Sequence, residues 1–262
     1  MTRIALLTGL IAASLPLAAL AAKPPLYDDF SGAEIERSRW FETEAWRYTS
    51  GGTLHMGRWL YGGTAADSGL VLESFNTTIS NNAAPKAFAA TIKVTDIATN
   101  EGCSFNPSPS QSRARLIAAY FNVRPGGPVP NDQTGDVIAQ IRLIRASNSV
   151  DPAGVLQVDG TLVECTNANC SNGNTLAFAD LGTVATGTPV TAQIEWSKAN
   201  NLFRFIRDKT QIVDATYTAG DGTSPAVPFV NLSLRNEAAN CFSAQRTKTG
   251  IAAEFDNVRI TQ

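Results

Sequence analysis

The chain has 262 residues and a formal net charge of −2, from 21 basic and 23 acidic residues with a single histidine. This balance provides no basic surface of the kind that binds nucleic acid or anionic membranes, so we predict no nucleic-acid partner. The single histidine and the absence of any Cys-x-x-Cys spacing also argue against a zinc site.

The first 22 residues have the layout of a secretory signal peptide. A short basic start at Met1–Arg3 precedes an uncharged apolar run over 4–20, and small residues follow. Ala19-Leu20-Ala21 fits the Ala-x-Ala cleavage pattern, which predicts a signal peptide over 1–21 and one mature domain over 22–262. The alternative is a membrane anchor, but the run is short and lacks a basic stop-transfer flank. We therefore predict a secreted or periplasmic protein without a membrane span.

The rest of the chain shows short alternating segments bounded by turn residues, which is the pattern of β-strands. The expected strands cover 88–94, 114–123, 137–145, 154–163, 190–197, 202–207, 211–217, 229–235 and 251–260. Three pieces rich in proline and glycine, 106–112, 124–135 and 220–228, are expected to be long loops. Turn signals at this spacing are typical of a β-sandwich, so we predict a single all-β domain.

The four cysteines favour two disulfides in an exported protein. Cys165 and Cys170 bracket a short hydrophilic tip, and Cys103 would then pair with Cys241. Three connectivities are open to four cysteines, and proximity along the chain favours this one.

Several segments resemble concanavalin A-like lectin/glucanase domains of the LamG-like jelly-roll type. These are the opening Tyr27-Asp-Asp-Phe-Ser-Gly32 with Ile35–Trp40, the hairpin of Val190–Trp196 with Leu202–Phe205, and the ending Ala253–Ile260. The resemblance implies a two-sheet antiparallel jelly-roll β-sandwich with long loops and a concave face on which relatives hold glycans. Lectins, glycosidases, lyases and interaction modules share this fold, so the fold alone does not select a function.

Non-catalytic carbohydrate binding on the concave face is the function we favour. Polar residues that alternate with apolar ones on the expected strands supply the candidate ligand-binding set. These are Tyr120, Asn122, Gln140, Arg142, Asn231 and Arg235. Arginine, amide and aromatic groups provide the fixed hydrogen bonds and the flat ring that a poly- or oligosaccharide needs. The alternative is an ordinary solvent face that binds nothing in particular.

Catalysis by carboxylates is a second hypothesis. If 40–46 is extended, Glu42 and Glu44 project to one face with a tryptophan on either side, near the spacing of a retaining glycosidase pair. Glu195 is a further candidate, with Arg142 as a charge stabiliser, in a glycoside hydrolase or polysaccharide lyase.

Known enzyme motifs are missing, which favours the absence of activity. The Glu-x-Asp-x-(x)-Glu run of related β-glucanases has no match, and Gln140-Ile-Arg142 has arginine where related alginate lyases carry histidine. His55 lies in a turn-rich segment without a Gly-x-Ser-x-Gly motif, so we interpret it as an ordinary surface residue. A third hypothesis is a structural or adhesion module that binds a protein.

A structural calcium ion is the one cofactor that we expect. Ca²⁺ prefers carboxylate and carbonyl oxygens, and the resemblance implies an ion between the first and last strands. Asp28, or its neighbour Asp29, and Asp256 would supply the ligands. Asp256 facing solvent or capping a turn is the alternative.

Overall fold

The computed structural model describes residues 44–100, 103, 105–242 and 247–262. This part contains thirteen β-strands and one short 3₁₀ turn, and it has no α-helix. The strands form two antiparallel sheets, so the predicted all-β sandwich is confirmed. The predicted signal peptide, Asp28, Asp29 and Glu42 lie outside the described residues. No helix within the described ranges has the length and apolar character needed to cross a membrane.

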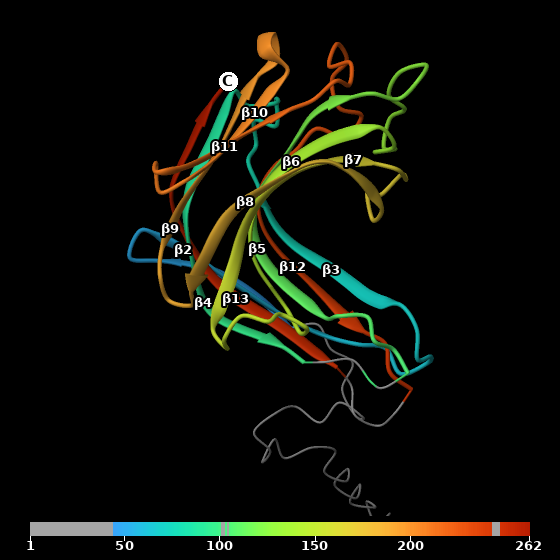
Figure 1. Ribbon diagram of the computed structural model, residues 1–262, viewed down its shortest axis with the longest axis vertical. Helices are drawn as coiled ribbons and strands as arrows, with labels where there is room; N and C mark the ends of the chain where they lie inside the picture. Colours follow the sequence, from blue (N-terminus) through green and yellow to red (C-terminus); the bar gives the residue numbers. More distant parts are fainter. Residues whose placement is uncertain (1–43, 101–102, 104, 243–246) are drawn as a thin grey trace, which may run out of the picture. The chain divides into compact units, whose positions relative to one another are not determined.

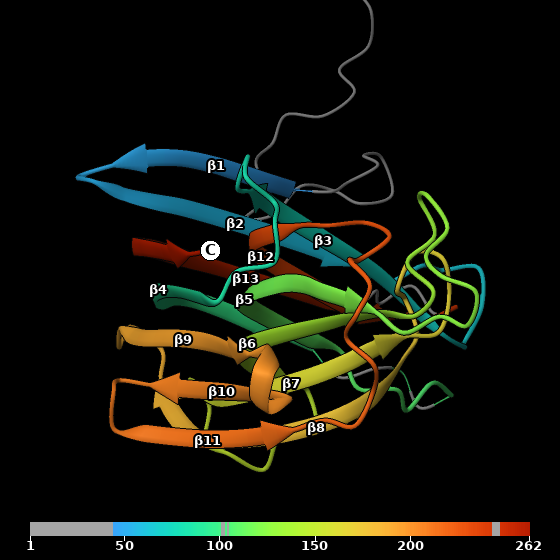
Figure 2. The same ribbon diagram turned by 90° about the horizontal axis from the view of Figure 1, so that it is seen from above.

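One sheet has seven strands, whose order across the sheet can be followed in Figure 2. In that order they are β1 (Glu44–Ser50), β2 (Thr53–Tyr61), β13 (Lys248–Thr261), β4 (Ala87–Thr99), β9 (Val190–Ser197), β10 (Leu202–Arg207) and β11 (Gln211–Thr216). The last strand of the chain therefore lies between two early strands, a pairing that no local sequence signal could indicate.

The other sheet has six strands. In spatial order they are β3 (Leu70–Thr78), β12 (Val230–Ala239), β5 (Gln111–Asn122), β6 (Asp136–Ala146), β7 (Val155–Cys165) and β8 (Gly173–Ala185). These strands bend so that the outer face of this sheet, turned away from the seven-stranded sheet, is concave (Figure 1). We call this outer face the concave face.

The hydrophobic core fills the space between the two sheets. Phe203 is fully buried there, with its ring centroid 4.8 Å from that of Tyr120 and 5.5 Å from that of Tyr217. The Trp196 indole donates a hydrogen bond to the Tyr217 hydroxyl at 2.9 Å. Burial, followed by the hydrogen bond to Asp221, raises the pKa of Tyr217 to about 12, so this hydroxyl stays protonated. The cluster lies next to the 3₁₀ turn Lys198–Asn200, since Lys198 Nζ stands 5.9 Å from the Trp196 ring centroid.

Nine expected strands correspond to β4–β7 and β9–β13, whereas β1, β2, β3 and β8 have no counterpart among them. The interpretation of the segment around His55 as turn-rich was wrong, because His55 lies within β2. Its ring stacks on Tyr48 with centroids 4.7 Å apart, and its Nδ1 lies 3.7 Å from Glu254. Gly51 and Gly52 do form the turn between β1 and β2, but β2 begins at Thr53 and Gly57 is part of it.

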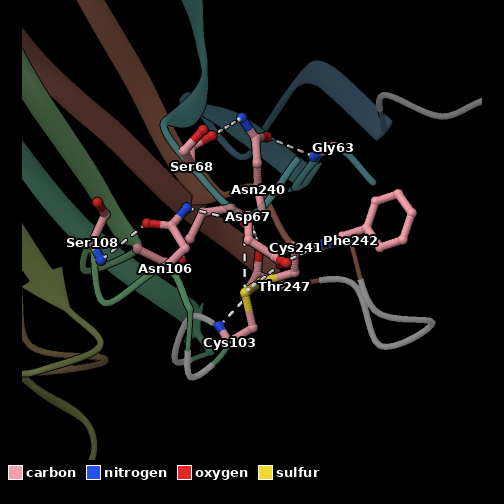
Figure 3. The surroundings of a disulfide bond; sticks show 12 residues. Gly63, Asp67, Ser68, Cys103, Asn106, Ser108, Asn240, Cys241, Phe242 and Thr247 are labelled. Carbon is pink, nitrogen blue, oxygen red and sulfur yellow. Dashed lines mark hydrogen bonds between the residues drawn. A yellow bond between two sulfur atoms is a disulfide. The ribbon is translucent and has the colours of Figure 1, made fainter. Parts of the chain in front are cut away.

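Both predicted disulfides are confirmed. Cys165–Cys170 closes the tip between β7 and β8, with Cα atoms 4.8 Å apart. Cys103–Cys241, with Cα atoms 5.8 Å apart, joins the segment after β4 to the segment after β12 (Figure 3). Beside it, the Asn240 side chain accepts a hydrogen bond from the Gly63 N–H at 2.8 Å and donates one to the Ser68 carbonyl at 3.0 Å. The bridge therefore fixes three loops at one end of the sandwich.

Candidate functional site

The central strands of the concave face present polar side chains in a regular row. In β5, Ala114 and Leu116 enter the core, so Arg113, Arg115 and Ile117 point to the opposite, concave face. Across the sheet, Arg115 is the register partner of Ser233 in β12 and of Arg142 in β6. Strand pairing therefore gathers side chains from distant parts of the sequence into one surface.

Two cavities lie on this face. The first has a volume of about 490 Å³, and Arg115, Gln140 and Asn231 are among the residues that line it. The second, of about 600 Å³, includes Arg142 and Asp159 in its lining. Because Arg142 is the cross-strand neighbour of Arg115, the two cavities are neighbours along the pair β5–β6. We call them the arginine cavity and the aspartate cavity.

Two carboxylates in the central strands are engaged by arginines. Asp159, which is only 2% exposed, accepts hydrogen bonds from Arg142 Nε at 2.6 Å and from Arg142 Nη2 at 2.9 Å. Glu237 accepts one from Arg235 Nε at 3.0 Å and another from Arg113. Both acidic groups are therefore engaged in hydrogen bonds with cationic arginine donors.

Arg115 differs from these arginines because its partners are neutral. Its Nε donates to Ser233 Oγ at 3.1 Å, its Nη1 to Gln140 Oε1 at 3.1 Å and its Nη2 to Ser74 Oγ at 3.3 Å. Burial, with a further contribution from neighbouring arginines, lowers the pKa of Arg115 to about 9. The guanidinium is therefore still protonated at neutral pH, in the floor of the arginine cavity.

Three buried polar atoms on the concave face have no hydrogen-bond partner among the described residues. They are Arg113 Nε, Thr161 Oγ1 and Asn231 Oδ1. Leaving a buried donor or acceptor unsatisfied costs about 1–3 kcal/mol, and folded proteins contain few such groups. Arg113 and Asn231 line the arginine cavity, where a ligand could satisfy them.

Four of the six predicted ligand-binding residues come together on the concave face. Gln140, Arg142, Asn231 and Arg235 line one or other cavity. Whether they bind a ligand stays a prediction.

The other two, Tyr120 and Asn122, do not share this face. A β-bulge between Ala119 and Phe121 shifts the register of β5, and the Tyr120 ring packs in the core. Asn122 is buried at the end of β5, where its side chain donates to Asp136 Oδ1 at 2.7 Å and to the Thr134 carbonyl at 3.1 Å. The expectation that both share a face with Gln140 was therefore wrong, because Tyr120 continues the alternation by which Ala114, Leu116 and Ala118 enter the core.

Two of the three candidate catalytic carboxylates, Glu44 and Glu195, lie far apart. Glu44 in β1 and Glu195 in β9 belong to the seven-stranded sheet, with three strands between them. Four strand spacings correspond to roughly 19 Å between their backbones. Glu195 accepts a hydrogen bond from Gln193 at 2.6 Å and lies 3.9 Å from Arg204. This separation exceeds the carboxylate spacing of either glycosidase class.

The predicted calcium ligand Asp256 is exposed on β13. Its Oδ1 accepts from the Asn257 backbone N–H at 2.6 Å, and its Oδ2 from the Asn257 side chain at 3.2 Å. Within the described ranges, the one group with three potential metal ligands consists of Asp67 and the disulfide-bonded Cys103 and Cys241. Asp256 alone does not make a calcium site, so the ion stays a prediction that depends on Asp28.

Arg113, Arg115 and Asp159 were not among the predicted site residues. The alternation Arg113-Ala-Arg115-Leu was a usable signal, since charged and apolar residues occupy opposite faces there. Further along the same strand both faces carry apolar residues, which hid the assignment.

No protein-family profile matches this chain, and no curated protein matches it in sequence. Solved structures similar to it include LamAcat from Zobellia galactanivorans, at 13% identity and a TM-score of 0.38, covering 82% of this chain and 80% of that one. The Emp47p carbohydrate recognition domain has 11% identity and a TM-score of 0.32, with coverage of 82% and 87%. Caenorhabditis elegans galectin LEC-6 has 8% identity and a TM-score of 0.27, with coverage of 76% and 96%. Likeness at this level assigns no function, and the concanavalin A-like relationship stays a resemblance.

Proposed function

We propose that the concave face binds a carbohydrate without catalysing a reaction on it. The observation that supports this proposal is the buried, hydrogen-bonding floor of the arginine cavity, where Arg113 Nε and Asn231 Oδ1 have no partner in the described part of the chain. Such atoms cost stability unless a ligand or water satisfies them. A ligand with many hydroxyl groups would supply the missing donors and acceptors.

The cavity also provides the apolar surface that a sugar ring needs. Ile117, Ile138 and Val163 line it beside the amides, and the half-buried Phe229 forms part of its wall. A volume of about 490 Å³ falls within the range of small-molecule sites. Sugars combine a polar edge with an apolar ring face, which matches this lining.

The carboxylates of the concave face support binding rather than catalysis. A glycosidase needs one carboxyl group that stays protonated to act as an acid. Asp159 and Glu237 each accept hydrogen bonds from arginine, so neither is free to donate a proton to a leaving group. Asp180, on the edge strand β8, is exposed and accepts from the Gly182 N–H at 2.8 Å. All three carboxylates are thus used as hydrogen-bond acceptors by neighbouring groups of the protein.

The proposed location is outside the cytoplasm. Both cysteine pairs form disulfides, which persist in oxidising compartments. This is compatible with the predicted signal peptide.

A glycan array probed with the mature chain tests the proposal, followed by assays of the bound polysaccharides for new reducing ends and unsaturated products. We expect binding without product. Asn231→Ala should weaken that binding with little change in Tm, because its Oδ1 makes no hydrogen bond within the described chain. Gln211→Ala, an exposed amide on the edge strand β11, is the matched control. Product formation would contradict the non-catalytic assignment, and no binding to any glycan would contradict the function itself.

A further inference from the structure

The arginine cavity has positive charges in its lining and no negative charge there to neutralise them. Arg113, Arg115 and Arg235 line it, and no acidic residue does. Glu237, which lies beside the cavity, is shared between Arg113 and Arg235. A neutral sugar would need hydrogen-bonding groups here but would gain nothing from uncompensated charge.

Strand register places these arginines against one another. Arg235 in β12 is the direct register partner of Arg113, and Arg115 is the direct partner of Arg142. Like charges directly opposite each other in a sheet are destabilising. Burial and the neighbouring arginines lower the pKa of Arg113, and burial and Arg142 lower that of Arg235. The fold therefore keeps two unfavourable like-charge pairs close together, and unfavourable local arrangements are often found at functional sites.

Arg115 retains capacity for a ligand. A guanidinium has five N–H groups, and three of those on Arg115 donate to Ser233, Gln140 and Ser74. The neutral partners hold the side chain in place without cancelling its charge. Two N–H groups therefore remain for a carboxylate or sulfate, which arginine binds in a geometry of paired hydrogen bonds.

Arg235 adds a second donor at the same cavity. Its Nε donates to Glu237, and neither of its Nη atoms makes a hydrogen bond to a described residue. The side chain is 16% exposed, so its terminus is open to a ligand. Together, Arg115 and Arg235 offer two fixed cationic groups at one wall of the cavity.

We propose that the carbohydrate is an acidic polysaccharide, whose carboxylate or sulfate group binds Arg115 and Arg235. This inference rests on the proposed carbohydrate binding and specifies its ligand. A nucleic acid shares the negative charge, but single strands need a series of aromatic side chains for base stacking. Phe229 is the one aromatic residue in the lining of this cavity, so the chemistry favours an acidic sugar.

The test compares matched pairs of glycans by calorimetry on the mature protein. Polygalacturonate is paired with its fully methyl-esterified form, and dextran sulfate with dextran, so that only the acidic group differs within a pair. Single-stranded DNA serves as a control, because it is a polyanion but not an acidic polysaccharide. We expect an acidic member to bind at least tenfold more tightly than its neutral form, since hydrogen bonds to charged groups are the stronger class. The two pairs distinguish a uronate from a sulfate.

Arg115→Gln should reduce acidic-glycan binding at least tenfold. Arg204→Gln removes the same charge from an exposed site on the seven-stranded sheet, where Arg204 pairs with Asp214, and should leave binding unchanged. Equal binding of neutral and acidic forms would overturn this inference but keep carbohydrate binding. An equal loss in both variants would also overturn it, since only bulk charge would then matter. DNA binding as tight as that of the best glycan would overturn the choice of ligand, and silence towards every glycan would refute the proposed function itself.

Discussion

Replacing Arg115 and replacing Arg142 should change stability in different directions, although both are arginines on the same face. Arg115→Met removes a buried guanidinium that has no carboxylate partner and relieves its like-charge contact with Arg142. Arg142→Met leaves Asp159, which is 2% exposed, without the arginine that donates to both of its oxygens. Comparing the two variants therefore tests whether Arg115 lacks a neutralising partner, which the ligand proposal requires.

The expected magnitudes follow from these partners. Leaving a buried charge without its partner costs about 3–5 kcal/mol, and the lower end applies because the Arg142 side chain is 17% exposed. For Arg115→Met, three hydrogen bonds of about 1 kcal/mol each are lost. The removed desolvation cost is several kcal/mol, so the net change is about 0–2 kcal/mol in the stabilising direction. At about 2–4 °C per kcal/mol, Tm falls by about 6–12 °C in Arg142→Met and stays level or rises in Arg115→Met.

Calorimetric melting at neutral pH, without added anions, measures both variants against the wild type, with urea titration as an independent check. A fall in Tm for Arg115→Met as large as that for Arg142→Met would refute the reasoning. It would show that Arg115 is a structural residue whose charge the fold already neutralises.

Three further predictions concern other parts of the chain. Hydrogen bonds from Thr134, ahead of the Arg124 contact, lower the pKa of Asp132 to about 2, below the unfolded value of about 3.9. The stabilisation that the Asp132 carboxylate provides should therefore be complete above about pH 5 and be lost towards pH 2. Plots of Tm against pH for Asp132→Asn and the wild type should converge in acid, and a constant difference in Tm would contradict this prediction. Replacing both Cys103 and Cys241 by serine should cost about 2–5 kcal/mol in urea titrations, because the bridge closes a loop with a sequence separation of 138; a smaller loss would mean that the loops hold without it. If Asp256 and Asp28 bind calcium, a chelator should lower Tm, and an unchanged Tm would contradict the prediction of a structural calcium ion.

The sequence predicted the parts of the fold whose signals are local. The hairpin β9–β10 alternates cleanly between apolar and polar residues, so its strands were predicted with their observed bounds. Cys165 and Cys170 were paired correctly because they lie five residues apart. Strands β3 and β8 were missed because they are edge strands and largely exposed, so few of their residues show the apolar alternation of a buried strand. The pairing of β13 between β2 and β4 depends on contacts far apart in the chain.

The site was predicted in part for the same reason. Gln140 stands between Ala139 and Ile141, which enter the core, and Arg235 follows Leu234, which does too, so their outward direction could be predicted from alternation. In β5 the alternation did not show which face is the core face, because Leu116 and Tyr120 lie on one face and Ile117 on the other, so both faces carry apolar residues. Tyr120 was therefore placed outward, and Arg115 was left out of the predicted set. A charge without a carboxylate partner becomes visible only when the neighbouring strands are known.

A crystal structure of the mature protein with the glycan found by the array tests the central claim most directly. The account predicts a sugar in the arginine cavity, with an acidic group within hydrogen-bond distance of Arg115 and Arg235 and a hydroxyl on Asn231 Oδ1. A sugar bound to the seven-stranded sheet, or to the loops with the concave face left empty, would contradict it.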